Sequence, residues 1–149
     1  GASVRVYRGG EARARAGGPP AYCSLDLAAA LTAQAHRAGI EIAAGTDGDT
    51  GAGAPYPGLF DELELLVRKA GFTPAQAIRS ATLVGAKSMG REDEMGTIAP
   101  GKLANLVVLA RDPLADIANM RSVVMTVKRG RAYPREDFRD VTEEELGRD

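Results

Sequence analysis

The sequence predicts an α/β fold, and three observations support this expectation. An amphipathic segment ends at Gly39 and leads directly into the short apolar run of residues 40–44, which is the order of a helix followed by a buried strand. Two further helical segments follow, and the last third of the chain is rich in β-branched residues between turn signals. A strand that is apolar on both faces is typical of a parallel sheet, which helices must cover.

The first helix is expected to start near Ser24 or Asp26, because either side chain can cap a helix N-terminus. Gly39 is expected to end it. Its apolar face is predicted from helical spacing to contain Leu27, Ala28, Leu31, Ala35 and Ala38. The single histidine, His36, lies on this helix, and we interpret it as a packing or surface residue rather than a metal ligand.

Two more helices are expected after residue 58. Residues 59–70 carry an apolar face made of Leu59, Leu63, Leu66, Val67 and Ala70. The run Thr73-Pro74-Ala75-Gln76 supplies a cap hydroxyl, a proline at the first helical position and a glutamine at the third. This capping box predicts a helix that starts at Pro74 and buries Ala77, Ile78, Ala81 and Val84.

From Gly96 onward the pattern changes to short β-rich runs. These are Thr97-Ile98, residues 106–109 and residues 123–127, separated by turn signals at Pro100-Gly101, Asp112-Pro113 and Gly130. The pattern predicts a small antiparallel sheet. We therefore divide the chain into residues 1–94, residues 95–135 and an acidic tail of residues 136–149.

Composition excludes several functional classes. The 149 residues, 44% of them hydrophobic, can form one ordinary domain. The balance of 19 Lys plus Arg against 20 Asp plus Glu provides no basic surface for nucleic acid. No apolar run reaches the length of a membrane span. The single cysteine, Cys23, excludes an internal disulfide and fits a reducing compartment, so we expect a cytoplasmic protein.

The main candidate for chemistry is Asp47, which follows the apolar run in the sequence Gly45-Thr46-Asp47. Functional side chains collect at the C-terminal ends of parallel strands. The competing interpretation is a simple turn in which the Asp47 side chain bonds its own backbone. A calcium loop starting at Asp47 is excluded, because Gly58 occupies the position that needs a bidentate glutamate.

The ordered series of motifs resembles one known family. The motifs are Ala44-Gly45-Thr46-Asp47, residues 59–67, residues 70–77, Ala81-Thr82-Leu83-Val84-Gly85-Ala86, residues 96–109 and Asp112-Pro113. Together they resemble the C-terminal third of the metal-dependent amidohydrolase superfamily, nearest to its imidazolonepropionase-like and dipeptidase-like group.

This resemblance implies a fold and an activity. It implies that residues 1–94 are the C-terminal part of a (β/α)8 TIM barrel whose last strand is residues 40–44, and that residues 95–135 are strands of a composite β-sandwich domain. It implies hydrolysis of a C–N bond in an amide, a cyclic amide or a dipeptide. Asp47 then inherits two roles, as a ligand of a divalent metal, commonly zinc, and as the catalytic group that moves a proton from the attacking water to the departing nitrogen.

The sequence also departs from the family. The His-x-His pair, the bridging lysine or glutamate and the later histidines have no counterpart, since His36 is the sole histidine. A catalytic zinc needs about three protein ligands, so we expect the chain alone to be inactive, to bind no metal and to be part of a longer enzyme. The alternative is a non-catalytic α/β remnant that acts as a binding or assembly module.

The expected partners follow from the same resemblance. They are a small-molecule substrate and either further copies of this chain or the missing N-terminal part of the barrel. A single barrel strand leaves both of its edges open, and open edges invite pairing. Neither nucleic acid nor a membrane is expected as a partner.

Overall fold

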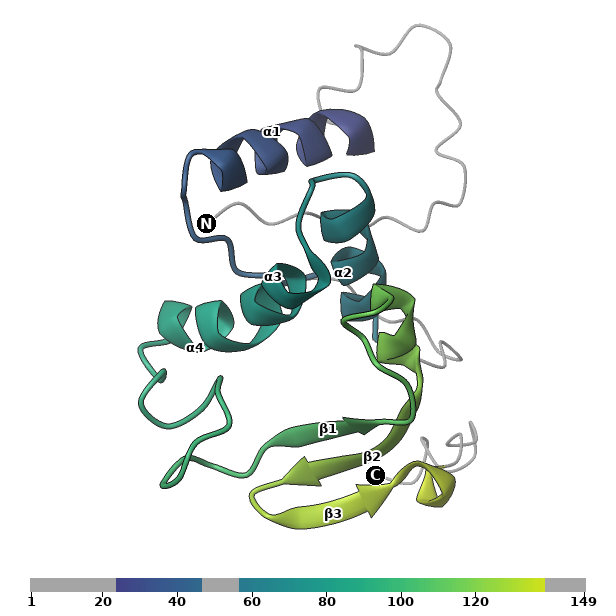
Figure 1. Cartoon of the computed structure of the whole chain (residues 1–149). Coiled ribbons are helices and arrows are strands. Elements are labelled where there is room, and N and C mark those ends of the chain that lie inside the picture. The colour runs from purple at the N-terminus through teal and green to yellow at the C-terminus, as the bar shows by residue number, and fades with distance from the viewer. Residues whose placement is uncertain (1–23, 47–56, 139–149) are drawn as a thin grey trace, which may run out of the picture.

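The chain combines a helical layer with a small sheet, in agreement with the predicted mixture of helices and strands (Figure 1). The computed structural model describes residues 24–46 and 57–138. The helical part contains α1 (Leu25–Arg37), α2 (Leu59–Arg68), α3 (Pro74–Arg79), the π-helical segment η1 (Ser80–Val84) and α4 (Gly85–Ser88). The C-terminal part contains β1 (Leu106–Leu109), the 3-10 helix η2 (Ile117–Arg121), β2 (Val123–Lys128), β3 (Arg131–Pro134) and the 3-10 helix η3 (Arg135–Asp137).

Helix α1 begins and ends as predicted, but the buried face differs from the expected one. The Ser24 hydroxyl accepts a hydrogen bond from the Leu27 N–H at 3.1 Å, and Gly39 ends the turn with a φ of +79°. The small face of Ala29, Thr32 and Ala33 is buried, whereas Leu27 is 46% and Leu31 is 58% exposed. The predicted leucine face is therefore wrong for the described part of the chain, because no other described element covers it.

The capping box before α3 is confirmed. The Gln76 N–H donates to the Thr73 hydroxyl at 3.2 Å, and the Thr73 N–H donates to the Gln76 side-chain oxygen at 2.8 Å. Pro74 occupies the first turn, where a missing N–H loses no intrahelical bond. This local sequence thus sets the start of α3 without help from tertiary contacts.

The core lies where α2, α3 and the segment after α1 meet. Leu63 and Leu66 of α2 are each 1% exposed, and Ala77 of α3 is fully buried. The buried cluster also contains Ala33, Ile42, Phe60, Ala70, Phe72 and Ile117. Arg121 of η2 pairs with Asp61 and Glu64 of α2, so the C-terminal part is joined to the helices by charge as well as by apolar packing.

The expectation of a strand at residues 40–44 is wrong for the described chain. These residues carry no strand assignment, and Ile40 is 59% exposed while Ile42 is 6% exposed. A strand is defined by hydrogen bonds to a neighbouring strand, and the described sheet contains β1, β2 and β3 alone. The apolar run is extended chain whose inward residue, Ile42, is packed in the core.

The predicted antiparallel sheet is confirmed, with one strand exchanged. Strand β1 pairs with β2, with Leu106 opposite Val127, and β2 pairs with β3, with Lys128 opposite Arg131. Thr97-Ile98 was expected to be a strand and is not. The strand β3 takes its place because Arg129 and Gly130, with φ of 50° and 81°, form a tight hairpin turn.

The sheet leaves apolar side chains open on its surface. Val107 of β1 is 50% exposed and Val124 of β2 is 45% exposed. None of the residues of the three strands is fully buried. A three-stranded sheet with a hydrophobic face normally packs against another element, so this sheet presents surface for a further layer.

Of the helices that the structure describes, none has the length and hydropathy needed to cross a bilayer.

Candidate functional site

Two backbone N–H groups at the end of the extended segment donate hydrogen bonds to two different helical segments. The Ala44 N–H donates to the Ser80 carbonyl oxygen at 3.1 Å. The next amide, the Gly45 N–H, donates to Glu62 Oε1 on α2 at 3.0 Å. We call Ala44, Gly45 and Thr46 the strand-end corner, because they end the segment that the sequence predicts to be a strand and lead directly to position 47. Residue 47 itself lies outside the described residues, so the structure does not locate the Asp47 side chain.

Glu62 is the most unusual side chain near this corner. It is 1% exposed, and its Oε2 atom has no hydrogen-bond partner among the described residues. Burial raises the pKa of the Glu62 carboxyl, and the Gly45 N–H opposes that change by stabilising the charged form. A buried carboxylate with one unpaired oxygen is an expensive feature, and such features collect at functional sites.

Sequence reasoning did not select Glu62, although one signal pointed to it. Glu62 lies one turn before Leu66 and one turn after Leu59, so it occupies the apolar face of α2. A charged residue within such a face is an exception to the amphipathic pattern. The predicted apolar face of this helix was correct in Leu63, Leu66 and Ala70, which are buried, but it did not include the glutamate among them.

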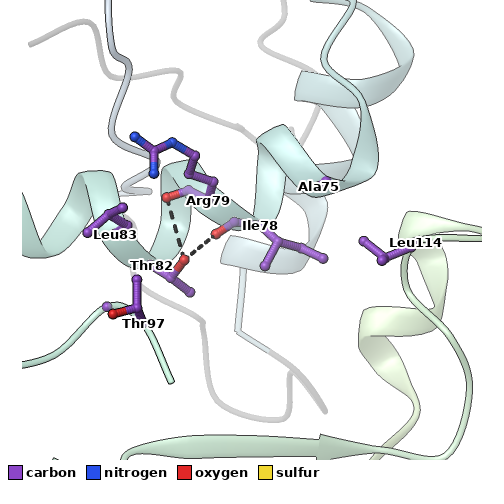
Figure 2. Close-up of a pocket in the computed structure, with 8 residues that line it drawn as sticks. Ala75, Ile78, Arg79, Thr82, Leu83, Thr97 and Leu114 are labelled. Carbon is purple, nitrogen blue, oxygen red and sulfur yellow. Dashed lines mark hydrogen bonds between the residues drawn. The ribbon is translucent and has the colours of Figure 1, made fainter. Parts of the chain in front are cut away.

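The Ser80 carbonyl belongs to a π-helical stretch between α3 and α4. Single π-turns within α-helices are rare and are frequent at functional sites. The Ser80 side chain is buried, and its hydroxyl donates to the Ala77 carbonyl at 2.9 Å. Thr82 donates its hydroxyl to the Ile78 carbonyl at 2.8 Å, the bond drawn in Figure 2. These contacts fix the segment on which the Ala44 amide rests.

Glu41, near the start of the extended segment, is held by the same helical stretch. Its carboxylate pairs with Arg79 at 2.8 Å and with Lys87 at 2.7 Å. The hydrogen bond from Lys87 is the main cause that lowers the pKa of Glu41, and burial opposes it. All three side chains are about half exposed, and ion pairs between exposed side chains add little to stability. The two ion pairs therefore serve mainly to orient the extended segment against the helical stretch.

A surface pocket of about 360 Å³ lies beside α3 and η1 (Figure 2). Ile78 and Leu114 face each other across it, and Thr97 closes another side. Gly96 approaches the helix so closely that a Cβ atom there would lie 2.8 Å from the Ala86 Cβ. Among the described residues, its lining contains no carboxylate, thiol or imidazole and shares no residue with the strand-end corner.

The described residues do not form a metal site by themselves. Across residues 24–46 and 57–138, no group of three or more His, Cys, Asp or Glu side chains is arranged to hold a metal ion. His36 stacks on Phe72 with ring centroids 3.8 Å apart, which is the packing role expected for it. A zinc site needs about three protein ligands, so the described residues fit a metal only as donors of part of a ligand set.

Comparison with known proteins defines the class of this protein. Residues 27–133 match the profile of the Amidohydrolase family. This match covers most of the chain, and the chain therefore belongs to the amidohydrolase family.

Individual relatives agree with this assignment. The chain is 30% identical over 113 residues to an imidazolonepropionase of Symbiobacterium thermophilum, which covers 74% of this chain and 26% of the relative. It is 37% identical over 82 residues to an ochratoxinase of Aspergillus niger, covering 54% of this chain and 16% of the relative. The chain thus spans about a quarter or less of the length of these curated relatives.

A solved structure shows the same relation. The crystal structure of a Xaa-Pro dipeptidase with methionine bound in its active site superposes with a TM-score of 0.64 and 31% sequence identity. The match covers 72% of this chain and 25% of that chain. The backbone described above is therefore shared with one part of a larger hydrolase.

Proposed function

We propose that this chain is the C-terminal portion of a metal-dependent amidohydrolase that hydrolyses a C–N bond in a small cyclic amide or a dipeptide. Residues 1–94 would supply the C-terminal part of a (β/α)8 barrel, residues 95–135 strands of a composite sandwich domain and residues 136–149 an acidic tail. Family membership over residues 27–133 supports this. The observation that carries it is the strand-end corner, held by Ser80 and Glu62 at the point where the chain reaches Asp47.

Asp47 is assigned two tasks in this proposal. One carboxylate oxygen binds a divalent metal, for which zinc is the first choice, and the carboxylate accepts the proton of the attacking water and passes it to the departing nitrogen. A metal bound there would lower the pKa of the coordinated water and polarise the scissile carbonyl. Gly45 and Thr46 carry no side chain that competes for this proton.

The remaining metal ligands must come from outside the described residues, because those residues hold no complete set. We expect the 149-residue chain, purified alone, to contain far less than one zinc per molecule and to show no hydrolysis of amides or dipeptides. The longer gene product, with the region upstream of Gly1, is expected to contain stoichiometric metal and to be active. Metal analysis and activity assays check both. Stoichiometric zinc in the isolated chain would contradict this division of the site.

A second candidate is a non-catalytic α/β remnant that acts as a binding or assembly module. The lack of a three-ligand group in the described residues favours it. The sequence of the gene region upstream of Gly1 distinguishes the two candidates. A His-x-His motif after a predicted strand is expected there for the enzyme and not for the non-catalytic remnant.

Exposed apolar surface supports a protein partner. The leucine face of α1, with Leu31 at 58% exposed, and Ile40, at 59% exposed, lie at the edge of the helical part. In the proposal these surfaces pack against the missing N-terminal part of the barrel or against a second copy of this chain. We therefore expect the isolated chain to self-associate. Size-exclusion chromatography with light scattering measures this, and a single sharp monomer peak would contradict it.

A further inference from the structure

The two contacts that hold the strand-end corner differ in kind. Ser80 contributes a backbone carbonyl, which any residue would provide, whereas Glu62 contributes a side-chain carboxylate. This carboxylate uses Oε1 for the Gly45 N–H at 3.0 Å and leaves Oε2 without a partner among the described residues. The position therefore depends on the identity of one side chain.

Stability alone does not explain a glutamate at this place. Glu62 is 1% exposed and shares the buried face of α2 with Phe60, Leu63 and Leu66. Replacing a buried, incompletely paired charge by an apolar side chain of similar volume is often neutral or stabilising. A residue selected only for packing at position 62 would be apolar, so the hydrogen bond to Gly45 is the feature that requires Glu62.

We propose that Glu62 is a positioning residue for Asp47, acting through the Gly45 amide. This inference rests on the proposed function of Asp47. The accepted hydrogen bond fixes the peptide plane that enters Gly45, and only the backbone of Gly45 and Thr46 separates that plane from residue 47. Among the hydrogen bonds of the described residues, Glu62 provides the side-chain contact to this corner, so its loss would free the corner while the helix packing stays.

Three variants of the full-length enzyme test this proposal. Glu62→Met has a similar length and no acceptor, so it removes the bond to Gly45. Glu62→Gln keeps a carbonyl oxygen that can accept the same N–H. Glu64→Gln on the same helix is the matched control, because Glu64 pairs with Arg68 and Arg121 and not with the corner.

The expected result separates positioning from packing. Glu62→Met should lower kcat by roughly 10- to 100-fold, as for small misplacements of a catalytic group, with KM and the unfolding temperature close to those of the parent. Glu62→Gln and Glu64→Gln should keep kcat close to the parent value. A fall of unfolding temperature in parallel with kcat in Glu62→Met, an unchanged kcat in that variant, or an equal loss in Glu62→Gln would overturn the proposal.

A measurement that does not use activity completes the test. Hydrogen exchange of the peptide that contains Gly45 should be faster in Glu62→Met than in the parent, and unchanged in Glu64→Gln, because exchange follows the loss of the accepted bond. Unchanged exchange in Glu62→Met would overturn the proposed contact. Asp47→Asn measured in parallel separates the two levels, since full activity in that variant would refute the role of Asp47 whatever the exchange shows.

Discussion

Asp47→Asn in the full-length enzyme is expected to abolish turnover while the fold is kept. Asparagine has nearly the same size as aspartate, but its amide cannot take the proton of the attacking water and is a poorer ligand for a divalent cation. General acid–base catalysis alone contributes about 10²- to 10⁴-fold to a rate, so kcat should fall by at least about a hundredfold. The measurement is steady-state hydrolysis of an amide or dipeptide substrate, together with metal content and circular dichroism.

Asp93→Asn is the matched control for this variant. Asp93 is exposed in the loop after α4, and the same change of charge there should leave kcat and metal content as in the parent. Activity near the parent level in Asp47→Asn would refute the assignment of Asp47. A parallel loss in Asp93→Asn would show that net charge, rather than the strand-end carboxylate, controls the rate.

Local signals in the sequence were sufficient for three helix boundaries, the end of α1, the end of α2 and the start of α3. The Thr73-Pro74-Ala75-Gln76 run determines the start of α3 through bonds within four residues, and Gly39 and Gly71 end their helices with φ of 79° and 76°. Capping boxes and C-terminal glycines act through residues a few positions apart, so these helix ends can be predicted from a single sequence.

Features that depend on distant partners could not be read in the same way. Residues 40–44 have the composition of a strand, but a strand exists only beside another strand, and the described chain supplies none for them. Strand β3 contains arginine and proline and forms because its hairpin partner β2 provides the hydrogen bonds. Glu62 acquires its importance from Gly45, 17 residues away along the sequence.

The candidate site shows both cases at once. The Gly45-Thr46-Asp47 motif was visible in the sequence, while the groups that hold it, the Glu62 side chain and the Ser80 carbonyl, became visible only through tertiary contacts. The motif predicts the chemistry, and the contacts from α2 and η1 hold Ala44 and Gly45, which precede Asp47 in the sequence.

Leu63→Ala should strongly destabilise the isolated 149-residue chain. Leu63 is 1% exposed and belongs to the cluster that contains Ile42, Phe72 and Ile117. This cluster packs α2 against the extended segment and the C-terminal part, and truncation of Leu63 would leave a cavity within it. A buried leucine replaced by alanine typically lowers the free energy of unfolding by about 2–5 kcal/mol. Urea denaturation followed by circular dichroism measures this loss.

Leu31→Ala is the informative companion to that variant. In the isolated chain Leu31 is 58% exposed, and an exposed truncation should change the free energy of unfolding by no more than about 0.5 kcal/mol. In the full-length enzyme the proposed barrel covers the leucine face of α1, so the same substitution should there cost about 2 kcal/mol or more. Equal and small effects in both proteins would mean that α1 faces solvent in the complete enzyme, and the barrel arrangement proposed for residues 1–94 would then be wrong.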